Sequence, residues 1–219
     1  MTTPLLQVQG LSFEYPERSL FKHWSHDFSP GLTWLRDANA DGYGSGKTSL
    51  LRLLATELTP AAGRLLALGV DASLDPLGYR RQLVWCGADL HSVAHLTPDG
   101  YISRLAGQHP AMDLAALPAL LQSLEVDALG HKTIDQLSTG TRRKLAVAVA
   151  LVSRAPVLLL DEPLAGVDQR SAKLICSRLA ALARDGQHLL VVASHADLGE
   201  ASDIAVRLDL PTGSGTTAY

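Results

Sequence analysis

The sequence predicts an α/β fold in which helices cover both faces of a mostly parallel β-sheet. A glycine-rich segment joins a short apolar strand to a leucine-rich helix near residue 47, and apolar strands alternate with helices from residue 140 onward. Before these segments, apolar and polar side chains alternate over residues 5–29. This alternation predicts an N-terminal antiparallel β subdomain.

Length and charge restrict the class of protein. A chain of 219 residues can hold one α/β domain with a full core. Its 19 basic and 22 acidic side chains give a net charge of -3, which argues against nucleic acid as the main partner. Cys86 and Cys176 are isolated in the sequence, so we expect no disulfide framework and a reducing compartment.

The two ends of the chain predict its domain limits. No apolar run approaches the roughly 20 residues that span a bilayer, and Met1-Thr2-Thr3-Pro4 lacks the features of a signal peptide. We therefore expect a soluble cytoplasmic chain with a single domain over residues 1–210. Residues 211–219 are rich in Gly, Ser and Thr, which predicts a flexible tail.

The first half of the chain is expected to consist mainly of short strands. A turn at Tyr15-Pro16-Glu17 predicts a hairpin or small sheet over residues 6–29, and residues 32–35 form a strand that enters the glycine-rich segment. A helix is predicted to begin near Lys47 and run through Leu54. After a break at residues 60–63, we expect an edge strand over residues 64–69 and an apolar strand over residues 79–85.

Helices dominate the prediction for residues 97–136. Leucines recur there at helical spacing and no strand-like run is present: Leu114, Leu117, Leu120, Leu121 and Leu124. The segment is predicted to be a small helical subdomain, and the alternative is a continuation of the main core. Beyond it we expect helices over residues 140–152 and 169–184 and strands over residues 157–160, 189–193 and 205–208.

The glycine-rich segment has the chemistry of a phosphate-binding loop. Glycines let backbone N–H groups converge on phosphate oxygens, a lysine adds positive charge, and a threonine hydroxyl can reach Mg²⁺. The helix that follows directs its positive end at the same anion. The alternative is a helix N-terminus without a ligand. The predicted nucleotide-binding residues here are Asn39, Gly42, Gly44, Ser45, Gly46, Lys47, Thr48 and Ser49.

The spacing of this loop is irregular. The usual pattern places a glycine five residues before Gly46, where this chain has Asp41. Treating residues 40–43 as an insertion restores the pattern, except that Asp37 then stands at the first glycine. A carboxylate in either register would face the phosphates, so we expect weakened nucleotide affinity and tighter binding when residues 40–43 are deleted.

Two adjacent carboxylates follow an apolar strand at Asp161-Glu162-Pro163. Charge at the end of a buried strand is costly unless a cation lies beside it. Asp161 is predicted to hold Mg²⁺ together with Thr48, and Glu162 to polarise a water that attacks the γ-phosphate. The alternative for Asp161 is the cap of the next helix.

His195 ends another predicted strand, at residues 189–194. Because ligands bind at the carboxyl ends of strands in parallel sheets, this imidazole could hydrogen-bond the γ-phosphate. The alternative is a surface histidine without a role, as is usual for a lone histidine.

Leu137-Ser138-Thr139-Gly140-Thr141, followed by Arg142, Arg143 and Lys144, resembles the Leu-Ser-Gly-Gly-Gln signature of ATP-binding-cassette ATPases. The Asp161-Glu162-Pro163 segment matches the same family, and the resemblance covers residues 5–208. The resemblance implies a P-loop NTPase fold of the RecA-like type that hydrolyses ATP with Mg²⁺. It also implies site roles: Tyr15 stacking on adenine, Ser138 and Gly140 as signature residues, Asp168 as a dimer contact, and Lys47, Glu162 and His195 in catalysis.

In this family the signature binds the nucleotide held by the opposite subunit, which implies two cassettes, identical or different, that close head to tail around two ATP molecules. The resemblance further implies a multi-pass membrane transporter subunit as partner, and a peripheral position on the cytoplasmic face of the bacterial inner membrane. The compact length and the signature residues resemble short exporter ATPases, including the haem-exporter type of cytochrome c maturation.

The chain departs from the family pattern at two places. Thr139 and Thr141 replace a glycine and a glutamine of the signature, and we expect the contact across the dimer to survive. The glutamine that contacts Mg²⁺ is missing, because Ala88 or Asp89 stands at its place and Gln82 lies too early. Asp89 is a candidate substitute as a metal or water ligand.

These departures leave two alternative functions. One is a regulatory cassette that binds nucleotide and has lost hydrolysis. The other is a cassette ATPase that acts on nucleic acid or ribosomes, which would ordinarily show two cassettes, a coiled-coil insertion or a basic tract; none is present in this sequence.

Overall fold

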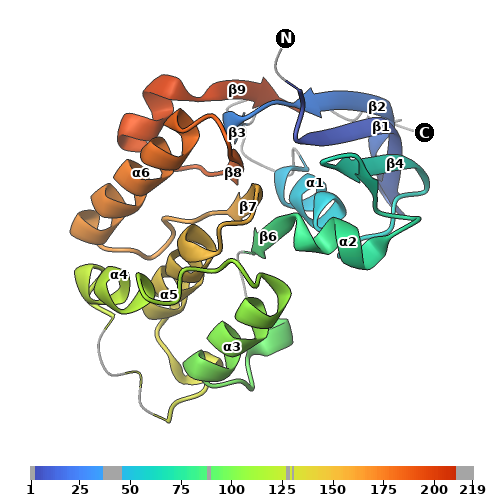
Figure 1. The fold of residues 1–219 in the computed structure, drawn as a ribbon. Coiled ribbons are helices and arrows are strands. Elements are labelled where there is room, and N and C mark those ends of the chain that lie inside the picture. The colour runs from blue at the N-terminus through green and yellow to red at the C-terminus, as the bar shows by residue number, and fades with distance from the viewer. Residues whose placement is uncertain (1–2, 37–45, 88–89, 127–128, 130, 211–219) are drawn as a thin grey trace.

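The computed structural model describes residues 3–36, 46–87, 90–126, 129 and 131–210. Its strands are β1 Leu6–Tyr15, β2 Arg18–Phe28, β3 Gly31–Arg36, β4 Ala62–Ala67, β5 Val70–Asp71, β6 Leu83–Cys86, β7 Val157–Asp161, β8 Leu189–Ala193 and β9 Val206–Asp209. Its helices are α1 Lys47–Leu54, α2 Pro76–Arg81, α3 Pro98–Gln108, α4 Leu117–Ser123, α5 Thr139–Val152 and α6 Gln169–Arg184, with 3-10 turns η1 His91–Val93, η2 Ile134–Gln136 and η3 Gly199–Ile204. The strands form two sheets (Figure 1).

The larger sheet has the order β6-β7-β8-β3-β9, and every pair in it is parallel. Side chains alternate between its two faces: in β7, Leu158 and Leu160 join one apolar cluster while Val157 and Leu159 join another. Helix α1 packs in the second cluster and α5 and α6 in the first. The predicted parallel sheet with helices on both faces is therefore confirmed.

The smaller sheet has the order β2-β1-β4-β5, and each neighbouring pair in it is antiparallel. It confirms the predicted N-terminal antiparallel unit. The strand predicted over residues 64–69 is present as β4 up to Ala67, but its predicted edge position is wrong, because β4 lies between β1 and β5. Leu68 and Gly69 have φ values of 49° and 80°, and this left-handed turn reverses the chain into the two-residue β5.

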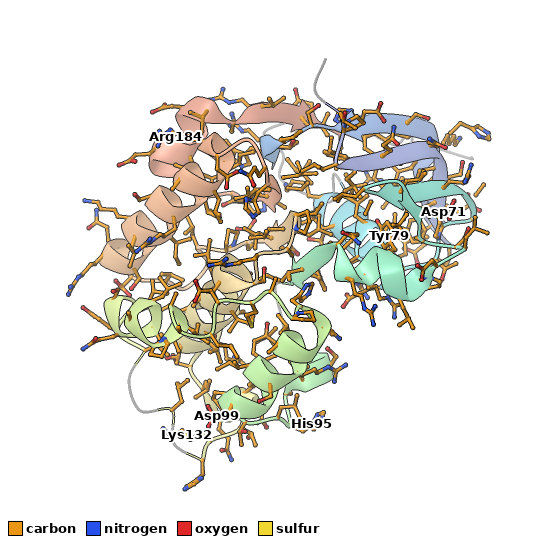
Figure 2. The ribbon with its side chains drawn as sticks, in the orientation of Figure 1. Asp71, Tyr79, His95, Asp99, Lys132 and Arg184 are labelled. Atoms are coloured by element: carbon orange, nitrogen blue, oxygen red, sulfur yellow. The ribbon has the colours of Figure 1, made fainter. Side chains whose placement is uncertain are left out.

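The predicted strand over residues 79–85 is wrong in its first half. Pro76 begins helix α2, and the Asp75 side chain accepts a hydrogen bond from the Gly78 N–H at 2.8 Å. Both are helix start signals that outweigh the apolar character of the segment. Tyr79 consequently points into the core from a helix (Figure 2), where its hydroxyl donates to the Leu54 carbonyl at 2.8 Å.

Residues 97–136 contain α3, α4 and η2, and no strand in their described part. The buried side chains Tyr101, Leu120 and Ile134 belong to the same apolar cluster as Leu158 and Leu160 of the sheet. This shared cluster favours a continuous core, and the division into a separate helical subdomain stays a prediction. Among the described helices, none is long and apolar enough to cross a membrane. The tail predicted over residues 211–219 lies outside the described residues.

Candidate functional site

The described residues include most of the predicted site: Tyr15, Gly46, Lys47, Thr48, Ser49, Ser138, Gly140, Asp161, Glu162, Asp168 and His195. Five predicted positions lie outside the described residues, as do Asp37 and Asp41: Asn39, Gly42, Gly44, Ser45 and Asp89. The predictions about the inserted residues 40–43 and the missing glutamine therefore stay predictions.

Helix α1 begins directly after a glycine in the left-handed conformation. Gly46 has a φ of 87°, which glycine adopts without strain, and its carbonyl accepts the Leu50 N–H at 2.7 Å. Lys47 follows at the first helical position and is only 8% exposed. Thr48 lies close enough to the Asp161 side chain to act against the rise in the pKa of that carboxyl. Strand order thus brings the first turn of α1 against the end of β7, as predicted.

Tyr15 lies at the edge of this group. Its hydroxyl is 3.2 Å from the Ser49 Oγ on α1, and its ring packs edge-to-face against Phe13 with centroids 5.0 Å apart. The ring is 40% exposed. An exposed aromatic face fixed beside the phosphate loop is consistent with stacking on a base, and this role stays a prediction.

Asp161 is the most buried charged group of the site. It is 2% exposed, and its Oδ2 has no hydrogen-bond partner among the described residues. Burial raises the pKa of this carboxyl, and the Thr48 hydrogen bond and the charges of Arg143 and Lys47 act in the opposite direction. A buried carboxylate oxygen without a partner is what a cation site would leave in a structure without ligands.

The donor set at Asp161 suits Mg²⁺. This ion binds oxygen ligands and commonly takes only one or two protein carboxylates beside substrate phosphates and water. Asp161 and Thr48 supply such oxygens at the end of α1. Within the described ranges no group of three or more His, Cys, Asp or Glu side chains is placed to hold a metal, so a closed all-protein metal site is not present in that part of the chain.

Glu162 directs its carboxylate to the loop after β8. Its N–H donates to the Ala193 carbonyl at 2.8 Å, and its Oε1 accepts the His195 N–H at 3.0 Å. The His195 Nε2 lies 3.6 Å from the same oxygen. Glu162 has a φ of 49°, a left-handed conformation that costs a residue with a side chain about 1–2 kcal/mol. Such strain concentrates at functional sites.

The loop that presents His195 is held by hydrogen bonds of its neighbour Ser194. Trp34 of β3 donates its Nε1–H to the Ser194 carbonyl at 3.1 Å, and the Ser194 hydroxyl donates to the Ala196 carbonyl at 3.0 Å. Ser194 is buried whereas the His195 side chain is 65% exposed. The exposed imidazole therefore projects from a buried support beyond the carboxyl end of β8, as its predicted contact with a phosphate would require.

The signature residues begin helix α5. Ser138 is its N-cap and accepts the Thr141 N–H at 3.1 Å. A Cβ added to Gly140 would lie 2.5 Å from the Gly166 carbonyl oxygen, so only glycine fits at this position. Ser138 and Gly140 thus contact Thr141 and the loop before α6, a neighbourhood distinct from that of Lys47 and Thr48.

Asp168 has a structural role within the chain. Its side chain caps α6 by accepting the Ser171 N–H at 2.9 Å, and it forms an ion pair with Lys144 at 2.5 Å. The hydrogen bond from Lys144 and the cap hold the pKa of this carboxyl well below its usual range. Its predicted contact across a dimer stays a prediction.

Arg143 was missed by the sequence predictions. It is 6% exposed, and its Nη1 donates to the carbonyls of Gly87 at 2.7 Å and Asp161 at 3.1 Å. Burial raises the pKa of the neighbouring Cys86 to about 11, and Arg143 acts in the opposite direction. A signal was present, because residue 143 shares a helix face with the apolar Val147 and Ala150 at i+4 and i+7.

Comparison with known proteins gives consistent relatives. The family model described as ABC transporter matches residues 42–165, more than half of the chain. The cytochrome c biogenesis ATP-binding export protein CcmA of Salmonella typhi is 31% identical over 96% of this chain and 98% of its own length. CcmA of Sphingopyxis alaskensis is 34% identical over 88% of this chain and 91% of its own.

Solved structures share the fold. The ATP-binding subunit of an ABC transporter superposes with a TM-score of 0.77 at 20% identity, covering 94% of this chain and 86% of the other. An ABC transporter ATP-binding protein from Pyrococcus furiosus gives a TM-score of 0.68 at 19% identity, with coverages of 93% and 96%. With the matched family and relatives similar over nearly their full length, the chain belongs to the ATP-binding cassettes of ABC transporters, and it is an ATPase of that family.

Proposed function

We propose that this chain hydrolyses ATP to drive export through a separate membrane-spanning protein, and that two cassettes form each working unit. The observation that carries the proposal is the convergence of Thr48, Asp161, Glu162 and His195 where α1 meets the ends of β7 and β8. Relatives that are similar over nearly the whole chain are named as export proteins, which supports the direction of transport.

ATP would bind with its phosphates at the amino end of α1. Backbone N–H groups of the first helical turn are directed at that point, and buried Lys47 adds a full positive charge. The exposed ring of Tyr15 provides a surface for the adenine. Mg²⁺ bound by Asp161 and Thr48 would neutralise charge on the phosphate oxygens.

Glu162 is the residue placed to activate water. Its carboxylate is 24% exposed and is fixed on one side by the His195 N–H, which leaves lone pairs to accept a proton from the attacking water. The His195 side chain lies beside the same carboxylate and can donate a hydrogen bond to the terminal phosphate. Loss of that phosphate would break the bond, which gives the loop after β8 a way to respond to hydrolysis.

A second cassette would complete each site. Ser138 and the N–H groups that begin α5 form an anion-binding end of a helix with 14 residues, and in this family they serve the nucleotide of the opposite chain. Closure around two ATP molecules and opening after hydrolysis would supply the mechanical step.

Hydrolysis tests the catalytic part of the proposal. Purified chain with MgATP is expected to release phosphate, and Glu162→Gln to lower the rate by about 100-fold or more with ATP affinity retained, because the carboxylate acts as the base. Glu200→Gln changes the same side chain at an exposed turn and should leave the rate unchanged. Equal background rates for the wild type and Glu162→Gln, with and without a membrane partner, would instead favour the regulatory cassette.

A groove beside β6 is the proposed docking site for the membrane partner. It has a volume of about 180 Å³, and its lining includes Trp85, Gly87, Leu90, Tyr101 and Arg104. In this family the loop after that strand contacts the membrane subunit, and here the groove lies directly beyond Gly87. Together with the relatives named as export proteins, this docking site supports the proposal that the chain works at the cytoplasmic face of a membrane.

Charge reversal at the rim of the groove tests the docking site. Arg104→Glu is expected to abolish copurification with a multi-pass membrane protein. Because Arg104 also lines the cavity that contains Thr48 and Asp161, ATP hydrolysis by the isolated variant is measured in parallel and should stay well above that of Glu162→Gln. Arg184→Glu is the matched control, because Arg184 lies at the carboxyl end of α6, away from α3 (Figure 2). Recovery of the wild-type chain with ribosomes or DNA and without a membrane protein would overturn the transporter assignment.

A further inference from the structure

The peptide unit that joins Asp161 to Glu162 is held on both of its polar sides. Its carbonyl, that of Asp161, accepts the Arg143 Nη1–H at 3.1 Å. Its N–H, that of Glu162, donates to the Ala193 carbonyl at 2.8 Å. This one peptide therefore joins Asp161, the predicted metal ligand, to Glu162, the predicted base, and its orientation depends on a side chain from α5.

This peptide requires such a constraint. Glu162 has a φ of 49°, and a residue with a side chain keeps this conformation only when its surroundings enforce it. Rotation of the peptide would swing the Asp161 carboxylate away from Thr48 and the Glu162 carboxylate away from His195. The hydrogen bonds from Arg143 and to Ala193 are the two backbone contacts that oppose this rotation.

The same guanidinium reaches the end of β6. Its Nη1 donates to the Gly87 carbonyl at 2.7 Å, at the point where the chain enters the loop that lacks the family glutamine. β6 and β7 are neighbours in register, with Cys86 opposite Leu160, so one buried cation joins the ends of two adjacent strands. Both bonds of this bridge are donated by the one Nη1 atom.

Arg143 also connects these strand ends to the signature. It lies one helical turn after Gly140, which is packed against the Gly166 carbonyl, and next to Lys144, which is paired with Asp168. The first turns of α5 are thus attached to β6, to β7 and to the loop that follows Glu162. A shift of one of these elements must be accompanied by a shift of the others.

We propose that Arg143 is a positioning residue for hydrolysis: it orients the Asp161–Glu162 peptide and fixes it to the helix that presents the signature to the opposite cassette. The proposal rests on the proposed ATPase function. ATP itself binds mainly to α1 and Tyr15, so Arg143 affects the rate of the chemical step more than the binding of ATP.

Substitutions at Arg143 test this division. Arg143→Gln is expected to lower kcat by about tenfold or more, since small displacements of catalytic groups cost large factors in rate. The KM for ATP should change by less than about threefold, and the Mg²⁺ concentration for half-maximal rate should rise. Arg143→Lys keeps the positive charge and part of the bridge between the two strand ends. Its kcat should therefore lie between that of the wild type and that of Arg143→Gln.

Stability needs a separate control, because removing a buried guanidinium also leaves carbonyls without partners. Val8→Ala lowers the melting midpoint from within the antiparallel sheet, where Val8 is 1% exposed, and does not touch the site. At a temperature below all midpoints its kcat should equal that of the wild type. If Arg143→Gln does not fold, Arg143→Lys alone decides the question.

The outcomes separate the two claims. An inactive wild type would overturn the proposed function and this inference together. If the wild type is active and Arg143→Gln retains its kcat and Mg²⁺ dependence, the inference alone is overturned. The same result in Arg143→Lys decides when only that variant folds. A loss of kcat in Val8→Ala as large as that in the Arg143 variant would show that only stability is involved, and would also overturn it.

Discussion

At the scale of a single residue, the proposed role of Asp161 as a cation ligand opposes the cost of burying its carboxyl group. Its burial at the end of β7 raises the pKa of the carboxyl, so the folded chain binds a proton there more tightly than the unfolded chain does. A raised pKa in the folded state means that stability is lost as pH rises from the unfolded value of about 3.9 through the folded value. As pH rises through this range, ionisation of the Asp161 side chain therefore lowers the stability of the folded chain unless a cation binds.

Asp161→Asn is expected to raise the melting midpoint at pH 7 without Mg²⁺ or nucleotide, and to abolish hydrolysis. For a chain of this size each 1 kcal/mol gained corresponds to about 2–4 °C. Calorimetry across pH 4–8 checks the sign, with Asp209→Asn as a control at an exposed position of β9. A midpoint that falls in Asp161→Asn would contradict this description of the site.

Asp168 shows the opposite pH behaviour. Its pKa is lowered first by the Lys144 hydrogen bond, so its contribution to stability is present above about pH 3.9 and is lost as pH falls below that value. Asp168→Asn keeps a good N-cap for α6 and removes the ion pair. We expect its midpoint to lie below that of the wild type at pH 7 and to converge with it in acid. A difference that is constant with pH would argue against the ion pair.

At the scale of elements, the contact between α5 and the loop before α6 is the tightest part of the site. Gly140 has no room for a side chain because the Gly166 carbonyl lies where its Cβ would be. The loop that follows Glu162 can therefore approach the signature helix closely enough for Lys144 to reach Asp168.

Gly140→Ala is expected to destabilise the chain by about 1–3 kcal/mol, as overpacking against backbone does. Gly107→Ala is the matched control, because Gly107 lies in α3 with open space around the added methyl. It should stabilise the chain by up to about 1 kcal/mol. Urea unfolding of both variants gives the comparison, and a neutral Gly140→Ala would mean that the loop can move away at no cost.

The bounds of helices and strands were predicted correctly where hydrophobic periodicity alone determined them. Helix α6 and strand β8 begin and end as expected, since their apolar periodicity agrees with burial. Helix α2 was missed because apolar residues such as Tyr79 and Leu83 outweighed the start signal Asp75-Pro76. Arg143 was missed because its partners, the carbonyls of Gly87 and Asp161, come together only in the tertiary structure.

At the scale of the whole molecule, the two groups of residues proposed to form one nucleotide site lie in different places of the chain. Lys47, Asp161 and Glu162 lie around the amino end of α1, whereas Ser138 and Gly140 lie at the start of α5. Sequence order and motif type predicted these residues. Their assembly into one site across two chains is the central part of the proposed function.

Complementation between two inactive variants tests this central claim most directly. Glu162→Gln removes the base of its own site and keeps Ser138 for the partner; Ser138→Arg blocks the partner's site and keeps its own Glu162. Each variant alone is expected to be inactive. Their mixture should recover up to about a quarter of the wild-type rate, because random pairing makes half of the dimers mixed and each mixed dimer has one intact site. A mixture no faster than the sum of its parts would contradict a site shared between two cassettes.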